Sequence, residues 1–166
     1  IRAGLAQHIK GWSLTLGAIL AASLFGIQDE LIQGIHSERT YGLPDMLVNT
    51  CGAIAGAFLS QSLNSSDITV NLKWRITNSL LLKSFSAALM LGGLVWGVIQ
   101  LADYREVWIP FSLFYLCLIG LVFWLVMIVV DTSSSGFSHF AKLIAILVGT
   151  SFFFPFLVNF MGLTFR

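Results

Sequence analysis

The chain has 166 residues, of which 57% are apolar and only 10% are charged, against roughly a quarter in ordinary soluble domains. Charged side chains normally cover a soluble protein's surface, and nine Lys and Arg with eight Asp and Glu are too few to do so here. The composition excludes a soluble domain, a secreted disulfide scaffold and a disordered chain, and the net charge of +1 argues against a nucleic-acid partner. We predict an integral membrane protein embedded in the lipid bilayer.

A membrane-spanning helix needs about 20 apolar residues. Five segments reach or approach this length: Gly11–Ile27, Pro44–Leu63, Ser79–Ala102, Trp108–Val130 and His139–Leu163. The first is expected to continue to Gln33, and Pro155 should kink the fifth or divide it. The sequence therefore predicts an all-α, polytopic bundle of about five transmembrane helices in one membrane domain.

The Lys and Arg residues near the predicted helix ends suggest an orientation, because cytoplasmic loops carry more of them. Six fall on one side: Arg2, Lys10, Lys73, Arg75, Lys83 and Lys142. Three fall on the other: Arg39, Arg105 and Arg166. We expect the visible N-terminal end to be cytoplasmic, in a bacterial inner membrane, and residues 28–43 to face outward. Because the first residue is Ile1, we also expect a preceding segment to be missing.

The charges gather in one place. Five of them lie within 17 residues, between the first two predicted helices: Asp29, Glu30, Glu38, Arg39 and Asp45. Glu30 and Gln33 share one face of the first helix, and the spacing of Asp45, Asn49, Gly52 and Gly56 places them on one face of the second. Antiparallel neighbouring helices would bring both faces together at the outer boundary.

An unpaired carboxylate at membrane depth costs about 2.5–3.5 kcal/mol on insertion scales, so we expect these groups to be paired. The fork of Arg39 could hold Glu30 or Asp45, and Asn49 could bind a carbonyl or a ligand. Structural alternatives are equally open: Asp45 could simply complement the N-terminus of the second helix, and Glu30 and Arg39 could form only a structural ion pair. Gly52 and Gly56 are expected to serve helix packing.

The same residues resemble the signature of the VanZ-like family. In that pattern an acidic residue and Gln end one transmembrane helix, Arg follows in a short loop, and the next helix carries D-x-x-x-N-x-x-G-x-x-x-G. Seven positions match with the same spacing: Glu30, Gln33, Arg39, Asp45, Asn49, Gly52 and Gly56. The resemblance implies a VanZ-like helix pair over residues 1–63, with three further transmembrane helices over residues 64–166. It also implies a small multi-pass protein of the bacterial cell envelope, in a family named for glycopeptide resistance and without an assigned reaction.

Three functions follow from this pattern. The first is recognition of a polar envelope or lipid headgroup at the outer membrane face through Glu30, Gln33, Arg39, Asp45 and Asn49. The second is a non-catalytic accessory subunit of a larger membrane complex, with other subunits as partners. Such a complex could contain pigments or quinones, for which the Phe residues around Pro155 offer a surface. The third is a small transporter.

No catalytic residues are predicted, because neither a nucleophile elbow nor a triad spacing occurs. The sequence also lacks a C-x-x-C or Cys/His cluster, so we predict no protein-bound metal. The sequence thus favours a role other than catalysis and leaves the cofactor open.

Overall fold

The computed structural model describes residues 5–6, 12–36, 38–63, 78–130, 135–163 and 166. Its helices are α2 (Trp12–Gln33), α3 (Leu43–Leu63), α4 (Asn78–Leu101), the short 3-10 helix η2 (Phe111–Phe114), α5 (Tyr115–Val130) and α6 (Ser135–Phe160). The described residues contain no strand, which confirms the all-α class. The predicted continuation of the first helix to Gln33 is confirmed as well.

Four helices contain stretches long and apolar enough to cross a membrane: Ser13–Gln33, Leu43–Leu63, Leu81–Leu101 and Phe140–Phe160. The fifth expected span begins three residues later than predicted, at Phe111, and ends at Val130 as predicted. The cause is Pro110, whose ψ of 137° is extended and which therefore caps η2 instead of lying inside a longer helix. The described residues thus form a multi-pass bundle with four long spans and the shorter apolar helix α5.

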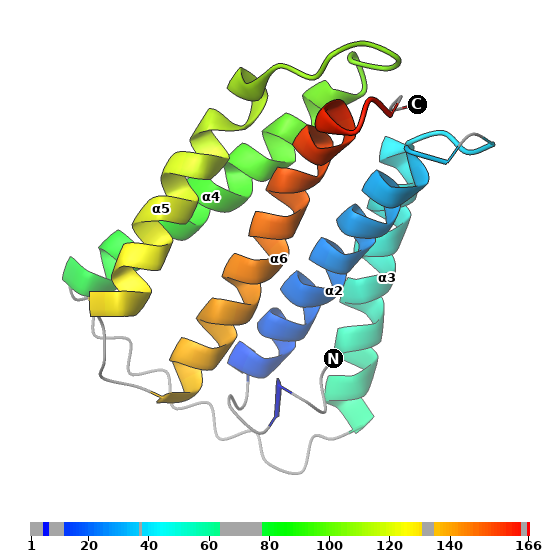
Figure 1. The fold of residues 1–166 in the computed structure, drawn as a ribbon. Coiled ribbons are helices and arrows are strands. Elements are labelled where there is room, and N and C mark those ends of the chain that lie inside the picture. Colours follow the sequence, from blue (N-terminus) through cyan, green and yellow to red (C-terminus); the bar gives the residue numbers. More distant parts are fainter. Residues whose placement is uncertain (1–4, 7–11, 37, 64–77, 131–134, 164–165) are drawn as a thin grey trace.

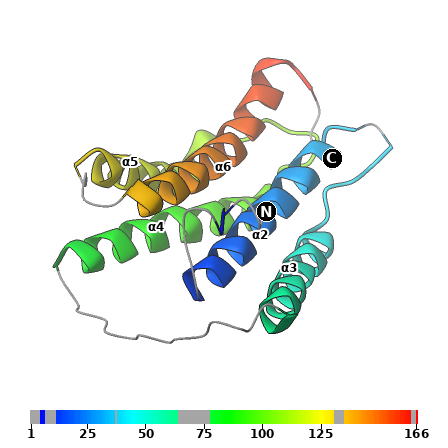
Figure 2. The same cartoon turned by 90° about the horizontal axis from the view of Figure 1, so that it is seen from below.

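Two helical hairpins make up most of the bundle. Helix α2 packs on α3 and α4 packs on α5, while α6 contacts α2, α4 and α5 and lies between the hairpins (Figure 1). Figure 2 shows α3 at the edge of the bundle beside α2. Of the buried residues of α3, only Met46 joins the main apolar core. The first hairpin therefore presents most of α3 to its surroundings.

Three segments lie at the same end of the bundle, which we call the loop end (Figure 1): the first loop (residues 34–36 and 38–42), the second loop (residues 102–110) and the tail after α6 (residues 161–163 and 166). Arg39, Arg105 and Arg166 all belong to it, as their shared side predicted. Lys83 and Lys142 lie near the N-terminal ends of α4 and α6, both at the end of the bundle that is opposite to the loop end. The other four basic residues of the prediction, Arg2, Lys10, Lys73 and Arg75, lie outside the described residues. Which of the two ends faces the cytoplasm stays a prediction.

Helices α4 and α5 approach each other through glycines. A Cβ atom built on Gly93 would lie 2.3 Å from the backbone nitrogen of Cys117, and one built on Gly120 would lie 2.3 Å from that of Met90. Gly97 leaves room for the ring of Phe114 in the same way. Small residues allow such backbone-to-backbone contact between membrane helices. These glycines therefore set the distance between α4 and α5.

Helix α6 runs through Pro155 as one element, so of the two expected effects of this proline, a kink or a division, the division is wrong. The helix ends at Phe160, and Gly162 just beyond it has a φ of +67° that favours glycine. The N–H of Gly162 bonds the carbonyl of Asn159, and the N–H of Leu163 bonds that of Val158, which is the Schellman arrangement. This stop directs the tail across the loop end.

The side chain of Asn159 fixes the second loop to α6. Its Nδ2 donates to the carbonyl of Ile109 at 2.9 Å, and its Oδ1 accepts from the N–H of Ile109 at 3.2 Å. Ile109 is fully buried, so both of its backbone groups need partners inside the protein. Asn159 therefore holds the second loop against the C-terminal end of α6.

Replacing Asn159 by Leu should therefore loosen the second loop. The substitution leaves two buried backbone groups unpaired, and each such loss costs about 1–3 kcal/mol. We expect the amide of Ile109 to exchange with deuterium at least about tenfold faster, measured by mass spectrometry in detergent. Met161→Ala, at a neighbouring exposed position, is the control and should leave this rate unchanged. Equal exchange in the two variants would contradict the clamp.

Candidate functional site

Glu30 lies at the centre of the predicted cluster. It is buried, with 2% of its surface exposed, and its carboxylate accepts a hydrogen bond from the backbone N–H of Gly42. Its Oε2 atom has no hydrogen-bond partner among the described residues. Asp29, Asp45 and Arg39 surround Glu30 closely enough to interact with it electrostatically. Because Gly42 directly precedes α3, the carboxylate also complements the N-terminus of that helix.

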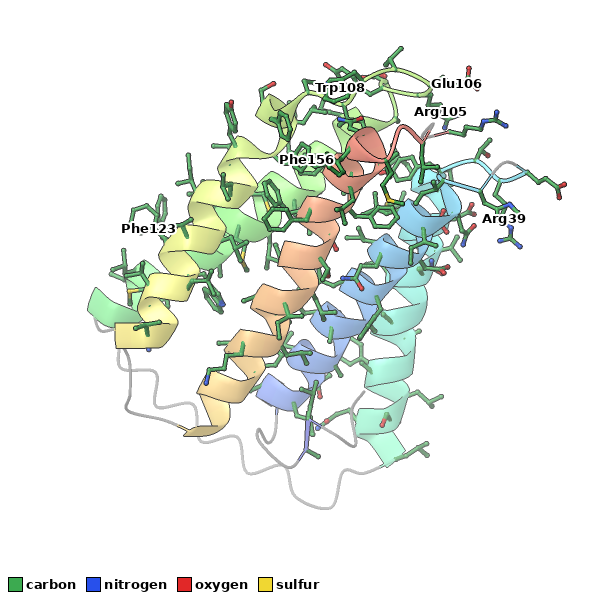
Figure 3. All side chains as sticks on the ribbon, viewed as in Figure 1. Arg39, Arg105, Glu106, Trp108, Phe123 and Phe156 are labelled. Carbon is green, nitrogen blue, oxygen red and sulfur yellow. The ribbon has the colours of Figure 1, made fainter. Side chains whose placement is uncertain are left out.

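Arg39 is held by a different partner from those expected. Its Nη1 donates to Oε1 of Gln33 at 3.1 Å, and Nε2 of Gln33 donates to the carboxylate of Asp29 at 2.8 Å. Within the described ranges, Arg39 forms no ion pair with Glu30 or Asp45. The reason is position: Glu30 is buried, whereas Gln33 is half-buried and Arg39 is exposed at the loop end. Figure 3 shows Arg39 on the first loop, pointing away from the bundle.

Asp45 and Asn49 lie on the first turns of α3 and are exposed. Oδ2 of Asp45 lies 2.7 Å from the position of a Cβ atom built on Gly42, so its carboxylate folds back over the end of the first loop. Cβ of Asn49 lies 2.9 Å from the equivalent position on Gly26, where α2 and α3 pass close to each other. The structure thus gathers Glu30, Asp45 and Arg39 and places Asn49 one turn deeper.

Gly52 and Gly56 continue the face of Asp45 and Asn49, but no described atom lies within 4 Å of a Cβ built on either. No helix of the described chain packs against them. The close glycine contacts lie in α4 and α5, and Gly93 with Gly97 has the same G-x-x-x-G spacing that drew attention to α3. The G-x-x-x-G spacing in the sequence indicates a helix-packing face, but it occurs in both α3 and α4 and does not show which of them packs closely.

Tyr41 is the residue that the sequence analysis missed. It is 1% exposed, and its hydroxyl donates to the carbonyl of Val98 at 2.5 Å. Its backbone N–H donates to the carbonyl of Arg166 at 2.7 Å, and its carbonyl accepts from Nη2 of Arg105 at 2.9 Å. No sequence motif predicts that Tyr41 joins these segments, because its partners come from distant parts of the chain.

The tail completes the network at the loop end. The backbone N–H of Arg166 donates to the carbonyl of Gly34 at 2.7 Å, so Arg166 bridges both ends of the first loop. Its Nε also lies 3.6 Å from the carboxylate of Glu106, beside Arg105 in Figure 3. The first loop, the second loop and the tail therefore hold one another in place at the loop end.

The charge of the cluster is unbalanced. Asp29, Glu30 and Asp45 bring three carboxylates, whereas Arg39 brings one guanidinium. In the part of the chain that the structure describes, no group of three or more His, Cys, Asp or Glu side chains is arranged to hold a metal ion. The arrangement can accept hydrogen bonds from hydroxyl or ammonium groups and can donate to an anion through Arg39.

No protein-family model, curated protein or solved structure matches this chain. The fold and the cluster define its class as an all-α, multi-pass membrane bundle with a polar loop end. The VanZ-like resemblance stays a prediction that depends on the seven spaced residues of the first hairpin.

Proposed function

We propose that this protein is a VanZ-like membrane protein that recognises a polar envelope or lipid headgroup at its loop end. The observation that carries the proposal is the surface chain Asp29–Gln33–Arg39 beside the exposed Asp45 and Asn49. Arg39 has five N–H donors. Gln33 orients the guanidinium by accepting one of them, which leaves the others available to a ligand. A guanidinium held in this way suits a phosphate group.

The excess of carboxylates in the cluster restricts the headgroups that can bind to those that carry hydrogen-bond donors as well as an anionic group. A purely anionic ligand would be repelled by Asp29 and Asp45, whereas a headgroup that also carries hydroxyl or ammonium donors would satisfy them. Glu30 is too deeply buried to meet such a ligand directly and instead fixes Gly42 at the start of α3. We therefore assign Arg39, Asp45 and Asn49 to ligand contact, and Gln33 and Glu30 to positioning.

Binding of a short-chain phosphatidylethanolamine tests this assignment, because its headgroup has both a phosphate and an ammonium group. Arg39→Ala should weaken binding about tenfold, since a hydrogen bond to a charged group contributes about 1.5–3 kcal/mol. Arg39→Lys should recover only part of the affinity, because lysine lacks the planar fork. Titration calorimetry on the purified protein in detergent measures both.

The matched control is Asp103→Ala, which removes an exposed charge at the same end of the bundle. It should bind like the unmodified chain. In cells, Arg39→Ala and Asp45→Ala should remove any effect on glycopeptide or envelope-stress sensitivity at unchanged membrane abundance. If protein levels fall together with the phenotype, the cluster is structural and the proposal is wrong.

A second candidate, the accessory subunit, is favoured by α3. This helix packs on α2 alone among the major contacts, and its Gly52–Gly56 face is open. Open small residues allow a further membrane helix to approach closely. An accessory subunit should co-purify with a stable partner after mild detergent extraction, and Gly56→Leu should weaken that association. A monodisperse chain without partners would reject this candidate.

A further inference from the structure

A small cavity lies between α2 and α6, separate from the cluster around Arg39. Its volume is about 140 Å³, and its lining combines three polar and three apolar side chains: Gln28, Leu31, Ile32, Thr150, Ser151 and Phe154. Ile32 and Thr150 are exposed, so the cavity opens at the surface of the bundle. Both helices contain membrane spans at these positions, which places the opening toward lipid.

The hydrogen bonds around the cavity use up its donors. Nε2 of Gln28 donates to the carbonyl of Leu147 at 2.9 Å and also to Oγ1 of Thr150. The hydroxyl of Thr150 donates back to the helix, at 2.9 Å from the carbonyl of Ile146, and that of Ser151 donates to the carbonyl of Leu147. These polar side chains therefore have no hydrogen left to offer a ligand.

Acceptors remain. No donor to Oε1 of Gln28 occurs among the described residues, although an amide oxygen normally accepts up to two hydrogen bonds. A second acceptor comes from the backbone: Pro155 has no N–H to give to the carbonyl of Ser151, four residues earlier in α6. Polar groups without partners are costly inside a membrane, so a donor from outside the chain would be favoured here.

We propose that this cavity binds the hydroxyl end of a long-chain alcohol or of a neutral lipid with a free hydroxyl. The hydroxyl would donate to Oε1 of Gln28, and the adjoining carbons would contact Leu31, Ile32 and Phe154. Cavities of about 150 Å³ hold a benzene-sized group, so only the first few carbons fit and the rest of the chain stays in lipid. Gln28 lies five residues before the end of α2, about 7 Å below it, a depth that the hydroxyl of a neutral lipid can reach.

Photolabelling with a diazirine-bearing hexadecanol and its methyl ether tests the proposal, because the ether keeps the chain but cannot donate. In the full chain reconstituted into phosphatidylcholine nanodiscs, the alcohol should label the segments around Gln28 and Ser151 at least tenfold more than the ether. Gln28→Leu should reduce labelling by the alcohol to the level of the ether. Equal labelling by the two probes would overturn the proposal.

Ile32→Trp provides a second test that preserves the hydrogen bonds of Gln28. Ile32 is 58% exposed, so a larger side chain can cover the opening without overfilling the core, and labelling should be lost. Leu16→Trp is the matched control on α2, at 61% exposure and away from the cavity, and should label like the unmodified chain. Labelling that survives Ile32→Trp would show that the alcohol binds elsewhere. Arg39→Ala should not affect labelling, because this site is independent of the proposed headgroup site.

Discussion

Replacing Gly93 or Gly120 by alanine is expected to separate α4 from α5 and to destabilise the bundle by about 3 kcal/mol, toward the upper end of the usual cost of overpacking. The new Cβ atoms would meet backbone atoms of the facing helix at 2.3 Å. Backbone atoms cannot rotate away as a side chain can, so the helices themselves must move apart. Unfolding in mixed detergent and SDS micelles, followed by circular dichroism, would show the lower stability.

Gly92→Ala is the control for these two variants. It changes the residue next to Gly93 on the same helix, but nothing lies within 4 Å of its added Cβ. Because alanine favours helices over glycine by about 0.5–1 kcal/mol, this variant should be as stable as the unmodified chain or slightly more stable. The assigned close contact is incorrect if Gly92→Ala and Gly93→Ala unfold at the same SDS fraction.

Tyr41→Phe is expected to destabilise the protein by about 2 kcal/mol, because it removes a cap from α4. The last four carbonyls of a helix have no intrahelical donor. Three of them, on Ile99, Gln100 and Leu101, accept from the backbone N–H groups of the residues that follow α4. The fourth, on Val98, accepts from the hydroxyl of Tyr41. The same unfolding assay measures the loss, and Tyr115→Phe, at an exposed tyrosine, should show none.

The hydroxyl of Tyr41 should also make the stability of the fold fall at alkaline pH. Burial, with a smaller effect from Glu30, raises the pKa of Tyr41 above its ordinary value near 10. The unfolded chain therefore loses this proton first, so stability is present below pH 10 and falls as the pH rises beyond it, by up to about 1.4 kcal/mol per pH unit. Tyr41→Phe should remove this part of the slope, and identical slopes between pH 10 and 12 would contradict the assignment.

Much of the fold could be predicted from the sequence, because membrane spans depend on local composition. The ends of α2 and α3 fall within one residue of the predicted ones, apart from the continuation to Gln33 that was itself foreseen. The short α5 could not be predicted in the same way. The residues directly before it, Trp108–Ile109, are as apolar as a helix, and Ile109 bonds instead to Asn159, a partner 50 residues away that the sequence does not indicate.

The candidate site was predictable in position but not in its pairing. Helical spacing placed Glu30 and Gln33 on one side of α2, yet their solvent exposure differs, and this difference decides which of them reaches Arg39. It arises from the packing of the first loop, which Tyr41 and Arg166 hold from a distance of many residues. Sequence patterns report neighbours along a helix and contain no information about such long-range contacts.

The place of α6 between the two hairpins has a consequence for biosynthesis. Its contacts with α2, α4 and α5 provide much of the helix packing that joins the first hairpin to the second, and α6 follows both hairpins in the chain. Each hairpin can form from contacts within itself as it enters the membrane, but the two can pack against each other only after α6 has been synthesised. Until then, the faces of α2 and α4 that α6 covers in the final structure stay exposed to lipid, where a membrane chaperone could bind them.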